Sequence, residues 1–378
     1  MTSIYLDHHA TTPVDPRVLA AMMPYLTSEI GNPGSPHGFG RRAAAAVERA
    51  RSELAALLGA APAEIVFTSG ATESNNLALR GASAWCEDLG RHIVTTTIEH
   101  NAVLQTAAEL EWCGYRVTRV PVDARGLVDP RDVADAIEPD TILVSVMLAN
   151  NEIGTVQPIA EIGEITRRRG VIFHVDAVQG LGKVPFDVER MRVDLASISA
   201  HKMYGPKGVG ALYVRRSSPC VRLVAELAGG GQEGGTRPGT LNVPGIVGLG
   251  AAAVLAAQEG PAEALRVRAL RDRLWVQVRG AGVALNGDLE RRLPQNLSVC
   301  VDVLGRPLVE RLDQLGVACS TGSACSTGKT PSHVLMALGR SREEALSGVR
   351  FGLGRSTTVQ EIDFAASAFR QALAERRR

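Results

Sequence analysis

Short apolar runs recur along the chain from about residue 64, and each is followed by a stretch that favours a helix or a turn. The runs are EIVFTS (64–69), RHIVTTT (91–97), TILVSVML (141–148), VIFHVDA (171–177), DLASIS (194–199) and GALYVR (210–215). Several are apolar at consecutive positions, which is typical of parallel strands covered on both faces. The pattern predicts a doubly wound α/β domain with a mainly parallel sheet over residues 32–248.

Residues 249–378 have a different pattern. A long helical stretch rich in Arg, Ala, Glu and Leu leads into the apolar runs QNLSVCVDV and VRFGLG, and an amphipathic helix follows. This pattern predicts a smaller α+β domain over 249–378. We expect an N-terminal segment, residues 1–31, to pack with that smaller domain.

Neither segment that could direct the chain to a membrane has the expected composition. The N-terminus, MTSIYLDHHATTP, lacks the basic and then apolar regions of a signal peptide. The longest uncharged stretch, 238–258, contains Pro244 and four glycines, and five of its apolar residues are alanines. We therefore expect a cytoplasmic protein with no membrane partner.

The charges are balanced, because the chain has 41 Lys and Arg residues and 40 Asp and Glu residues. A net charge of +1 gives no electrostatic reason to expect direct nucleic-acid binding. Only four of the basic residues are lysines: Lys183, Lys202, Lys207 and Lys329. Arginine stays protonated in proteins, so any chemistry that needs a free amine must use one of these four.

Ligands of open α/β sheets bind beyond the carboxyl ends of the strands. One strand end of this chain could bind an anion such as a phosphate, and the next could contact a planar ring. The first continues into TSGATESNN, with Gly70 and Thr72 where a helix begins. Free amides and the helix dipole bind anions there, although an ordinary N-cap made by Thr72 is the alternative. His100 follows the next strand, where its ring could cover a planar ligand, transfer protons or be structural.

Two further strand ends carry a carboxylate and an amine. Asp176 closes an apolar strand, where a carboxylate suits a pyridinium nitrogen, a helix N-cap or an ion pair. Lys202 directly follows a buried strand. Partial desolvation there would lower its pKa and leave an amine that can condense with an aldehyde, the alternative being an ordinary surface lysine.

One cofactor uses all four features, namely pyridoxal 5'-phosphate. It needs an anion site, a group over its ring, a carboxylate for its ring nitrogen and an amine for its aldehyde. The joint occurrence at strand ends favours this cofactor over the four separate alternatives. The six cysteines form no CxxC pair and no zinc-binding spacing, so we expect no metal.

The chain resembles a known family over essentially its whole length. The motifs YLDHHATTPVDPR, TSGATESNN, EHNAV, NNEIG, HVDAVQ, SAHKMYGPKGVGALYVR, RPGTLN, TGSAC and VRFGLGR occur in the order found in cysteine desulfurases of the bacterial iron–sulfur-assembly type. These enzymes belong to the class V aminotransferase-like branch of the fold type I pyridoxal phosphate enzymes. The resemblance implies a homodimer that transfers sulfur from L-cysteine to an acceptor protein.

The resemblance also assigns roles to individual residues. Lys202 would bind the cofactor aldehyde, Asp176 the pyridine nitrogen and Gln179 the ring hydroxyl, while His100 would stack on the ring and move protons. Arg350 would bind the substrate carboxylate through a bidentate contact. The remaining contacts, most of them to the cofactor phosphate, would come from Ala71, Thr72, Asn151, Ser199 and His201, with Thr240 supplied by the partner subunit.

The reaction itself depends on Cys325, in a Gly/Ser/Thr-rich run expected to form a mobile loop. A thiolate there could take the sulfur of the substrate, so that L-alanine leaves and a persulfide remains. Cys319 is the rival thiol and fits a packed small hydrophobe, whereas a disulfide with Cys325 or a metal pair with His333 has no supporting ligand spacing. We assign structural roles to Cys86, Cys113, Cys220 and Cys300.

Two other functions stay open on the sequence alone. One is a pyridoxal phosphate-dependent cysteine or selenocysteine lyase that releases free product without an essential persulfide. The other is a non-catalytic assembly module that keeps the fold. The chain ends soon after the last predicted helix. The sequence also leaves the identity of the sulfur acceptor open, which could be an iron–sulfur scaffold, a tRNA-thiolating protein or another carrier.

Overall fold

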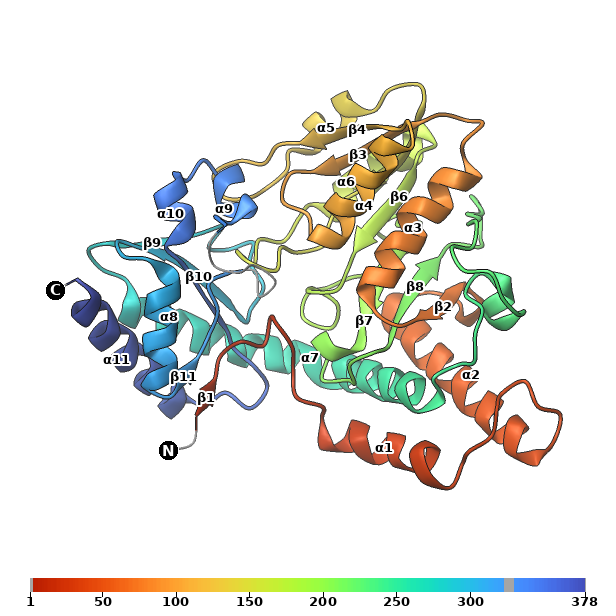
Figure 1. The fold of residues 1–378 in the computed structure, drawn as a ribbon, viewed down its shortest axis with the longest axis horizontal. Helices are drawn as coiled ribbons and strands as arrows, with labels where there is room; N and C mark the ends of the chain where they lie inside the picture. The colour runs from red at the N-terminus through yellow and green to blue at the C-terminus, as the bar shows by residue number, and fades with distance from the viewer. Residues whose placement is uncertain (1–2, 323–329, 378) are drawn as a thin grey trace.

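A computed structural model describes residues 3–322 and 330–377 of the chain. Its centre is a seven-stranded sheet (Figure 1). The strands in spatial order are β2 (Ile65–Thr68), β8 (Gly210–Val214), β7 (Leu195–Ser199), β6 (Ile172–Asp176), β5 (Thr141–Ser145), β3 (His92–Thr96) and β4 (Arg116–Val120). β8 is antiparallel to both of its neighbours, and the other pairs are parallel. The predicted mainly parallel α/β sheet is confirmed.

Two apolar clusters cover the two faces of this sheet. Adjacent residues of one strand point to opposite faces, so Leu143 joins one cluster and Val144 the other. This double coverage explains why the strands are apolar at consecutive positions. On one face lie α3 (Ala71–Trp85) and α4 (Asn101–Trp112); on the other lie α1 (Pro16–Thr27), α2 (Gly38–Leu58), α5 (Pro130–Ala136) and α6 (Ile159–Arg169).

A third cluster forms the core of a smaller unit. It combines an antiparallel sheet of β12 (Gly348–Gly352), β10 (Asn296–Val301) and β9 (Val283–Leu285) with the parallel pair β1 (Ile4–Tyr5) and β11 (Val317–Ala318). α8 (Gly305–Gln314) and α11 (Val359–Arg376) pack in this cluster. α9 (His333–Ala337) and α10 (Arg342–Leu346) pack in a separate apolar cluster that includes Cys300 of β10. The 3₁₀ turns of the described residues are η1 (Pro62–Glu64), η2 (Ala200–Lys202) and η3 (Gln232–Gly235).

One helix, α7 (Val243–Val278), belongs to both units. Its first part, to Ala256, packs in the core of the large sheet, and its last part, from Val267, packs with the small unit (Figure 1). The predicted domain limit at Gly248 therefore falls inside a continuous helix. α7 is long and apolar enough to cross a membrane. Most of its apolar stretch is buried inside the protein, however, as in a core helix.

The N-terminal segment is shared in the same way. Leu6 beside β1 packs in the small unit, whereas Val18 of α1 packs in the core of the large sheet. The two-domain division over 1–31, 32–248 and 249–378 stays a prediction, with α7 and the N-terminal segment as its connections.

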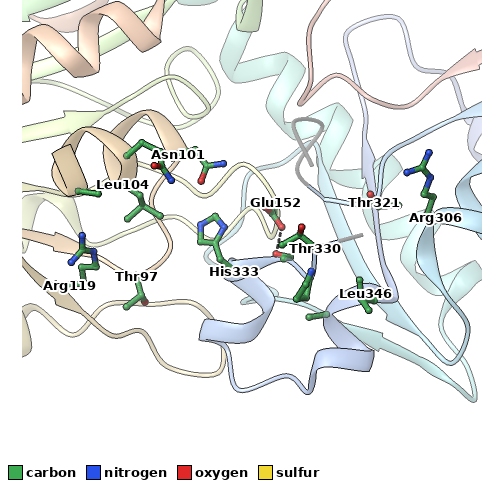
Figure 2. Close-up of a pocket in the computed structure, with 15 residues that line it drawn as sticks. Thr97, Asn101, Leu104, Arg119, Glu152, Arg306, Thr321, Thr330, His333 and Leu346 are labelled. Atoms are coloured by element: carbon green, nitrogen blue, oxygen red, sulfur yellow. Dashed lines mark hydrogen bonds between the residues drawn. The ribbon is translucent and has the colours of Figure 1, made fainter. Parts of the chain in front are cut away.

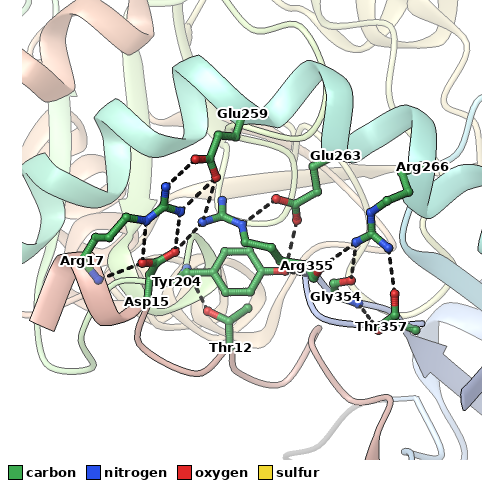
Figure 3. Close-up of polar contacts among 10 residues, drawn as sticks. All are labelled: Thr12, Asp15, Arg17, Tyr204, Glu259, Glu263, Arg266, Gly354, Arg355 and Thr357. Atoms are coloured by element: carbon green, nitrogen blue, oxygen red, sulfur yellow. Dashed lines mark hydrogen bonds and ion pairs between the residues drawn. The ribbon is translucent and has the colours of Figure 1, made fainter.

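A polar network joins these units beside the carboxyl ends of the strands (Figure 3). Arg355, just after β12, binds Asp15 and Glu263 at 2.7 Å each, and its guanidinium lies 4.4 Å from the ring centroid of Tyr204. The Tyr204 hydroxyl accepts a bond from the Arg355 backbone N–H at 2.6 Å and donates to Glu263. Tyr204 has a φ of 62°, unusual for a residue with a side chain, so this network holds a strained turn two residues after Lys202.

Candidate active site

A cavity of about 530 Å³ opens at the carboxyl ends of β2, β3, β6 and β7. Its lining includes ten of the residues predicted to form the site: Ala71, Thr72, His100, Asn151, Asp176, Gln179, Ser199, His201, Lys202 and Arg350. The fold therefore brings together side chains from six separate segments. This is the position at which open α/β sheets bind their ligands.

Lys202 lies at the end of η2, just beyond β7, and is partly buried. Its Nζ donates to the carbonyl oxygens of His9 and Ala10 at 2.5 and 2.6 Å. Burial, together with the positive charges of Lys183 and Arg350, lowers the pKa of Lys202 to about 7. A substantial fraction of this amine is therefore neutral near pH 7.

Asp176 ends β6 and is 6 % exposed. It accepts bonds from Asn75 Nδ2 at 2.9 Å and from the backbone N–H of Val178 at 3.1 Å. Among the described residues it has no ion-pair partner, so this carboxylate on the cavity wall is balanced only by neutral donors. Such a site can take a cationic group of a ligand.

The buried side chain of His9 connects the cavity to the small unit. The Gln179 amide donates to the His9 carbonyl oxygen at 3.1 Å, and its oxygen lies 3.0 Å from His9 Nδ1. His9 Nε2 lies 3.1 Å from Asn296 Nδ2, so the network assigns the proton to Nδ1. Burial holds the pKa of His9 well below its usual range, which keeps the ring neutral.

The first turn of α3 is open to the cavity. Its N-cap is Gly70, which has no side chain to satisfy the free amides, so capping by Thr72 does not occur. Gly70 has a φ of 151°, which disfavours any residue with a side chain. The free amides and the positive helix end can therefore bind an anion beside Ser199 and His201.

Two further histidines, His100 and His201, line the cavity. His100 caps α4, because its Nδ1 accepts from the backbone N–H of Ala102 at 3.1 Å. His201 Nδ1 lies 3.1 Å from the hydroxyl of Thr11. Burial lowers the pKa of His201 to about 4, and nearby lysines contribute. His201 can thus supply a hydrogen bond near neutral pH, but no charge.

Arg350 of β12 reaches the cavity from the small unit and is 1 % exposed. Its two terminal nitrogens donate to the Asn151 carbonyl oxygen and to Asp7 Oδ1, each at 2.8 Å. Its Nε is buried without a hydrogen-bond partner in the described part of the chain. The guanidinium is therefore held rigidly and keeps unused donors for an anionic group.

Three residues of this site escaped the sequence reasoning: Asp7, His9 and Asn75. All three lie inside motifs that the sequence analysis quoted, YLDHHATTPVDPR and TSGATESNN. The motifs were the only signal for them, because their partners are 101 to 343 residues away in the sequence.

Two predicted site residues are not part of this cavity. Thr240 is exposed and does not line the cavity of its own chain. Cys325 lies outside the described residues. The residues on either side of that segment, Thr321 and Thr330, line a second cavity of about 520 Å³ (Figure 2).

This second cavity lies between α4 and the small unit and adjoins the first. Asn151 lines the first cavity, and the next residue, Glu152, lines the second. Glu152 accepts a bond from the Ser332 hydroxyl at 2.5 Å, and His333 Nε2 donates to the carbonyl oxygen of Glu99 at 3.1 Å.

The other cysteines differ in exposure. Burial raises the pKa of Cys86, Cys300 and Cys319, which fits packed thiols. Cys319 packs against the apolar core of the small unit, as predicted. Cys113 and Cys220 are exposed, so burial gives no reason for a structural role.

One group of described residues has metal-ligand spacing: His92, Glu138 and Asp140. Both ring nitrogens of His92 are within hydrogen-bonding distance of threonine hydroxyls, and both carboxylates bind Arg116. These contacts account for the group without an ion.

Comparison with known proteins agrees with this geometry. The family model Aminotransferase class-V matches residues 4–364. Cysteine desulfurase IscS of Anaeromyxobacter dehalogenans (strain 2CP-C) is 57% identical over 371 residues, which cover 97% of this chain and 91% of that relative. The chain therefore belongs to the class V aminotransferase family.

Its similarity to cysteine desulfurases, over nearly the whole chain, places it with that group. A solved NifS-like protein superimposes with a TM-score of 0.93 at 40% identity and covers 99% of this chain and 100% of its own. A structure titled SspA in complex with cysteine gives a TM-score of 0.82 at 38% identity, with 93% and 99% covered.

Proposed function

We propose that this protein is a pyridoxal phosphate-dependent cysteine desulfurase, which removes sulfur from L-cysteine, releases L-alanine and passes the sulfur on from Cys325. The observation that carries this proposal is that Asp176, Lys202 and the open first turn of α3 face one cavity. The similarity to cysteine desulfurases at more than half identity supports the same reaction.

The residues around the cavity fit pyridoxal phosphate. Asp176 lacks a cationic partner among the described residues and suits a protonated ring nitrogen, and the Gly70 N-cap leaves amides free for a phosphate. The lowered pKa of Lys202 supplies a neutral amine for the aldehyde. When bound, the cofactor provides the electron sink that weakens bonds at the amino-acid α-carbon.

The surrounding side chains would orient the cofactor. Gln179 uses one of its two amide hydrogens on the His9 carbonyl, so the other is free for the ring hydroxyl. His100 would cover the ring, and its Nε2 would move the proton, because Nδ1 is occupied by the Ala102 amide. The phosphate would lie against Ala71, Thr72, Ser199 and His201.

Substrate orientation would come from Arg350 and Asn151. The unused donors of Arg350 can bind the carboxylate of L-cysteine in the manner of an Arg–carboxylate fork. The bond from Arg350 to the Asn151 backbone holds the guanidinium at the cavity wall. Both residues therefore belong to the proposed substrate site.

Cys325 would receive the sulfur and deliver it to an acceptor protein, either an iron–sulfur scaffold or a tRNA-thiolation protein. We propose a cytoplasmic homodimer, in which Thr240 completes the partner's cavity. Thr240 is exposed and is not among the residues that line the cavity of its own chain, which supports that arrangement.

The deciding experiment compares wild type with Cys325→Ser for alanine, free sulfide and protein-bound persulfide. We expect Cys325→Ser to bind the cofactor normally and to lose cysteine-dependent alanine formation. Cys319→Ala, six residues earlier in the sequence, is the matched control and should keep turnover. Full turnover of Cys325→Ser with free sulfide would instead establish the lyase alternative, and a protein that binds no pyridoxal phosphate would favour a non-catalytic module.

A further inference from the structure

A small cavity of about 20 Å³ lies beside the catalytic cavity, where the units of the protein meet. Its lining includes His8, Lys183, Tyr204, Glu263 and Gln295. Two of these lining residues, Tyr204 and Glu263, belong to the network around Arg355 (Figure 3). The function proposed above gives this cavity no role.

One stretch of chain, residues 8–12, separates the two cavities. His8 and Thr12 line the small cavity, whereas His9, Ala10 and Thr11 line the catalytic cavity. Lys202 donates to the carbonyl oxygens of His9 and Ala10 from the catalytic side. Lys183 and Lys202 therefore lie on opposite sides of the same stretch of backbone.

The small cavity contains polar groups without partners. Gln295 is 5 % exposed, and neither its amide oxygen nor its nitrogen has a hydrogen-bond partner among the described residues. The Lys183 amine likewise makes no hydrogen bond within residues 3–322 and 330–377. A volume of about 20 Å³ holds one water molecule, which can bridge the amide and the ammonium.

Lys183 keeps its charge near neutral pH. Burial lowers its pKa to about 8, and the negative charge of Glu263 acts in the opposite direction. Glu263, however, already binds Arg355 at 2.7 Å and the Tyr204 hydroxyl at 3.1 Å. Lys183 is thus a partly buried cation whose nearest carboxylate is shared with another cation.

Besides Lys183, charges of both signs act on Lys202. Arg350 lowers the pKa of Lys202, but its ion-pair partner Asp7 raises it, and the two lie 2.8 Å apart. Asp176 raises the pKa from the end of β6, and Lys183 is the strongest of the charges that act on Lys202. The remaining titratable groups on the cavity wall are His9, Glu73, His100, His201 and Lys207.

We propose that Lys183 is a positioning residue that favours the neutral amine form of Lys202 across residues 8–12. Its ammonium raises the energy of a second positive charge on the other side of this backbone. The inference deepens the proposed function, because a neutral Lys202 is the form that condenses with an aldehyde.

The test measures the protonation of Lys202 directly in cofactor-free protein. Acetic anhydride labels neutral amines, so the labelling rate of the Lys202 peptide against pH, followed by mass spectrometry, has its midpoint at the pKa of Lys202. We expect Lys183→Met, which removes the charge and keeps the stem, to move this midpoint upward by roughly one pH unit. Lys183→Arg, which keeps a charge, should leave the midpoint within a few tenths of a unit of wild type.

Lys207→Met is the matched control, because Lys207 also lines the catalytic cavity but is exposed. In Lys207→Met, the labelling of Lys202 should have the same pH midpoint as in wild type. If Lys183→Met does not fold, Lys183→Gln tests the same charge with a polar side chain. An unchanged midpoint in a folded neutral variant overturns the proposal, even if the melting temperature falls. Because labelling uses neither cysteine nor cofactor, it is independent of whether the desulfurase reaction is correct.

Discussion

Lys202 Nζ lies 2.5 Å from the carbonyl oxygen of His9, a residue 193 positions earlier in the chain. A second carbonyl, that of Ala10, accepts from the same amine at 2.6 Å. The N-terminal segment thus completes the site around the amine, while burial lowers the pKa of that amine to about 7. The reactive form of Lys202 depends on this enclosure.

Replacing Lys202 tests whether its neutral amine is needed. Arg keeps the positive charge and can still donate to the two carbonyl oxygens, but it does not lose its proton near neutral pH. We expect Lys202→Arg to lose at least ~100-fold in cysteine-dependent alanine formation and to lack the visible absorbance of bound cofactor. Lys207→Arg serves as the control, and retained absorbance in Lys202→Arg would contradict this role.

Arg350 should act mainly on substrate binding. Lys at this position keeps the charge but loses the planar fork that the unused donors provide. We therefore expect Arg350→Lys to raise the KM for cysteine about tenfold or more, with a smaller change in kcat. Steady-state kinetics on variants with equal cofactor content separate the two constants, and an unchanged KM would rule out the proposed carboxylate contact.

Tyr204 and Tyr213 form a matched pair for the network beside the site. The Tyr204 hydroxyl makes two hydrogen bonds, whereas that of Tyr213 is buried without a partner in the described chain. Tyr204→Phe should lower the free energy of unfolding by about 1–2 kcal/mol, and Tyr213→Phe should be neutral or slightly stabilising. Urea unfolding measures both; equal effects would show that the network contributes nothing.

The stability of the protein should depend on pH through Glu99. Burial raises the pKa of Glu99 to about 8, and its Oε2 has no hydrogen-bond partner among the described residues. Between about pH 4.5 and 8, the folded state holds this proton while the unfolded chain releases it. The contribution of Glu99 to the free energy of unfolding therefore falls as pH rises through that window.

Glu99→Gln removes this titration and keeps an oxygen for the Thr96 hydroxyl and the Met147 amide, which Glu99 binds at 2.7 and 3.0 Å. Its stability relative to wild type should increase from pH 5 to pH 8, by at most roughly 1.4 kcal/mol per pH unit. Glu290→Gln, at an exposed position, is the control. A pH-independent difference between Glu99→Gln and wild type would mean that Glu99 is ionised in the fold.

Some features of the site were evident from local sequence. Gly70 before a predicted helix indicated an anion site, although only the structure excluded capping by Thr72. Asp176 and Lys202 stood out because each lies at the end of an apolar run, where an unpaired charge is costly. The strands themselves were recognisable from consecutive apolar residues, such as Leu143 and Val144, which the fold buries on opposite faces.

By itself, the sequence determined the mainly parallel sheet, the ligand position at its strand ends and the chemical types gathered there. These features follow from local periodicity and from the cost of placing polar groups beside buried strands. Only the tertiary structure decided which groups balance one another: Asp7 against Arg350, His9 against Gln179, and Lys183 behind Lys202. Such pairings join residues far apart in the chain, and their energies depend on burial and distance, which no local pattern specifies.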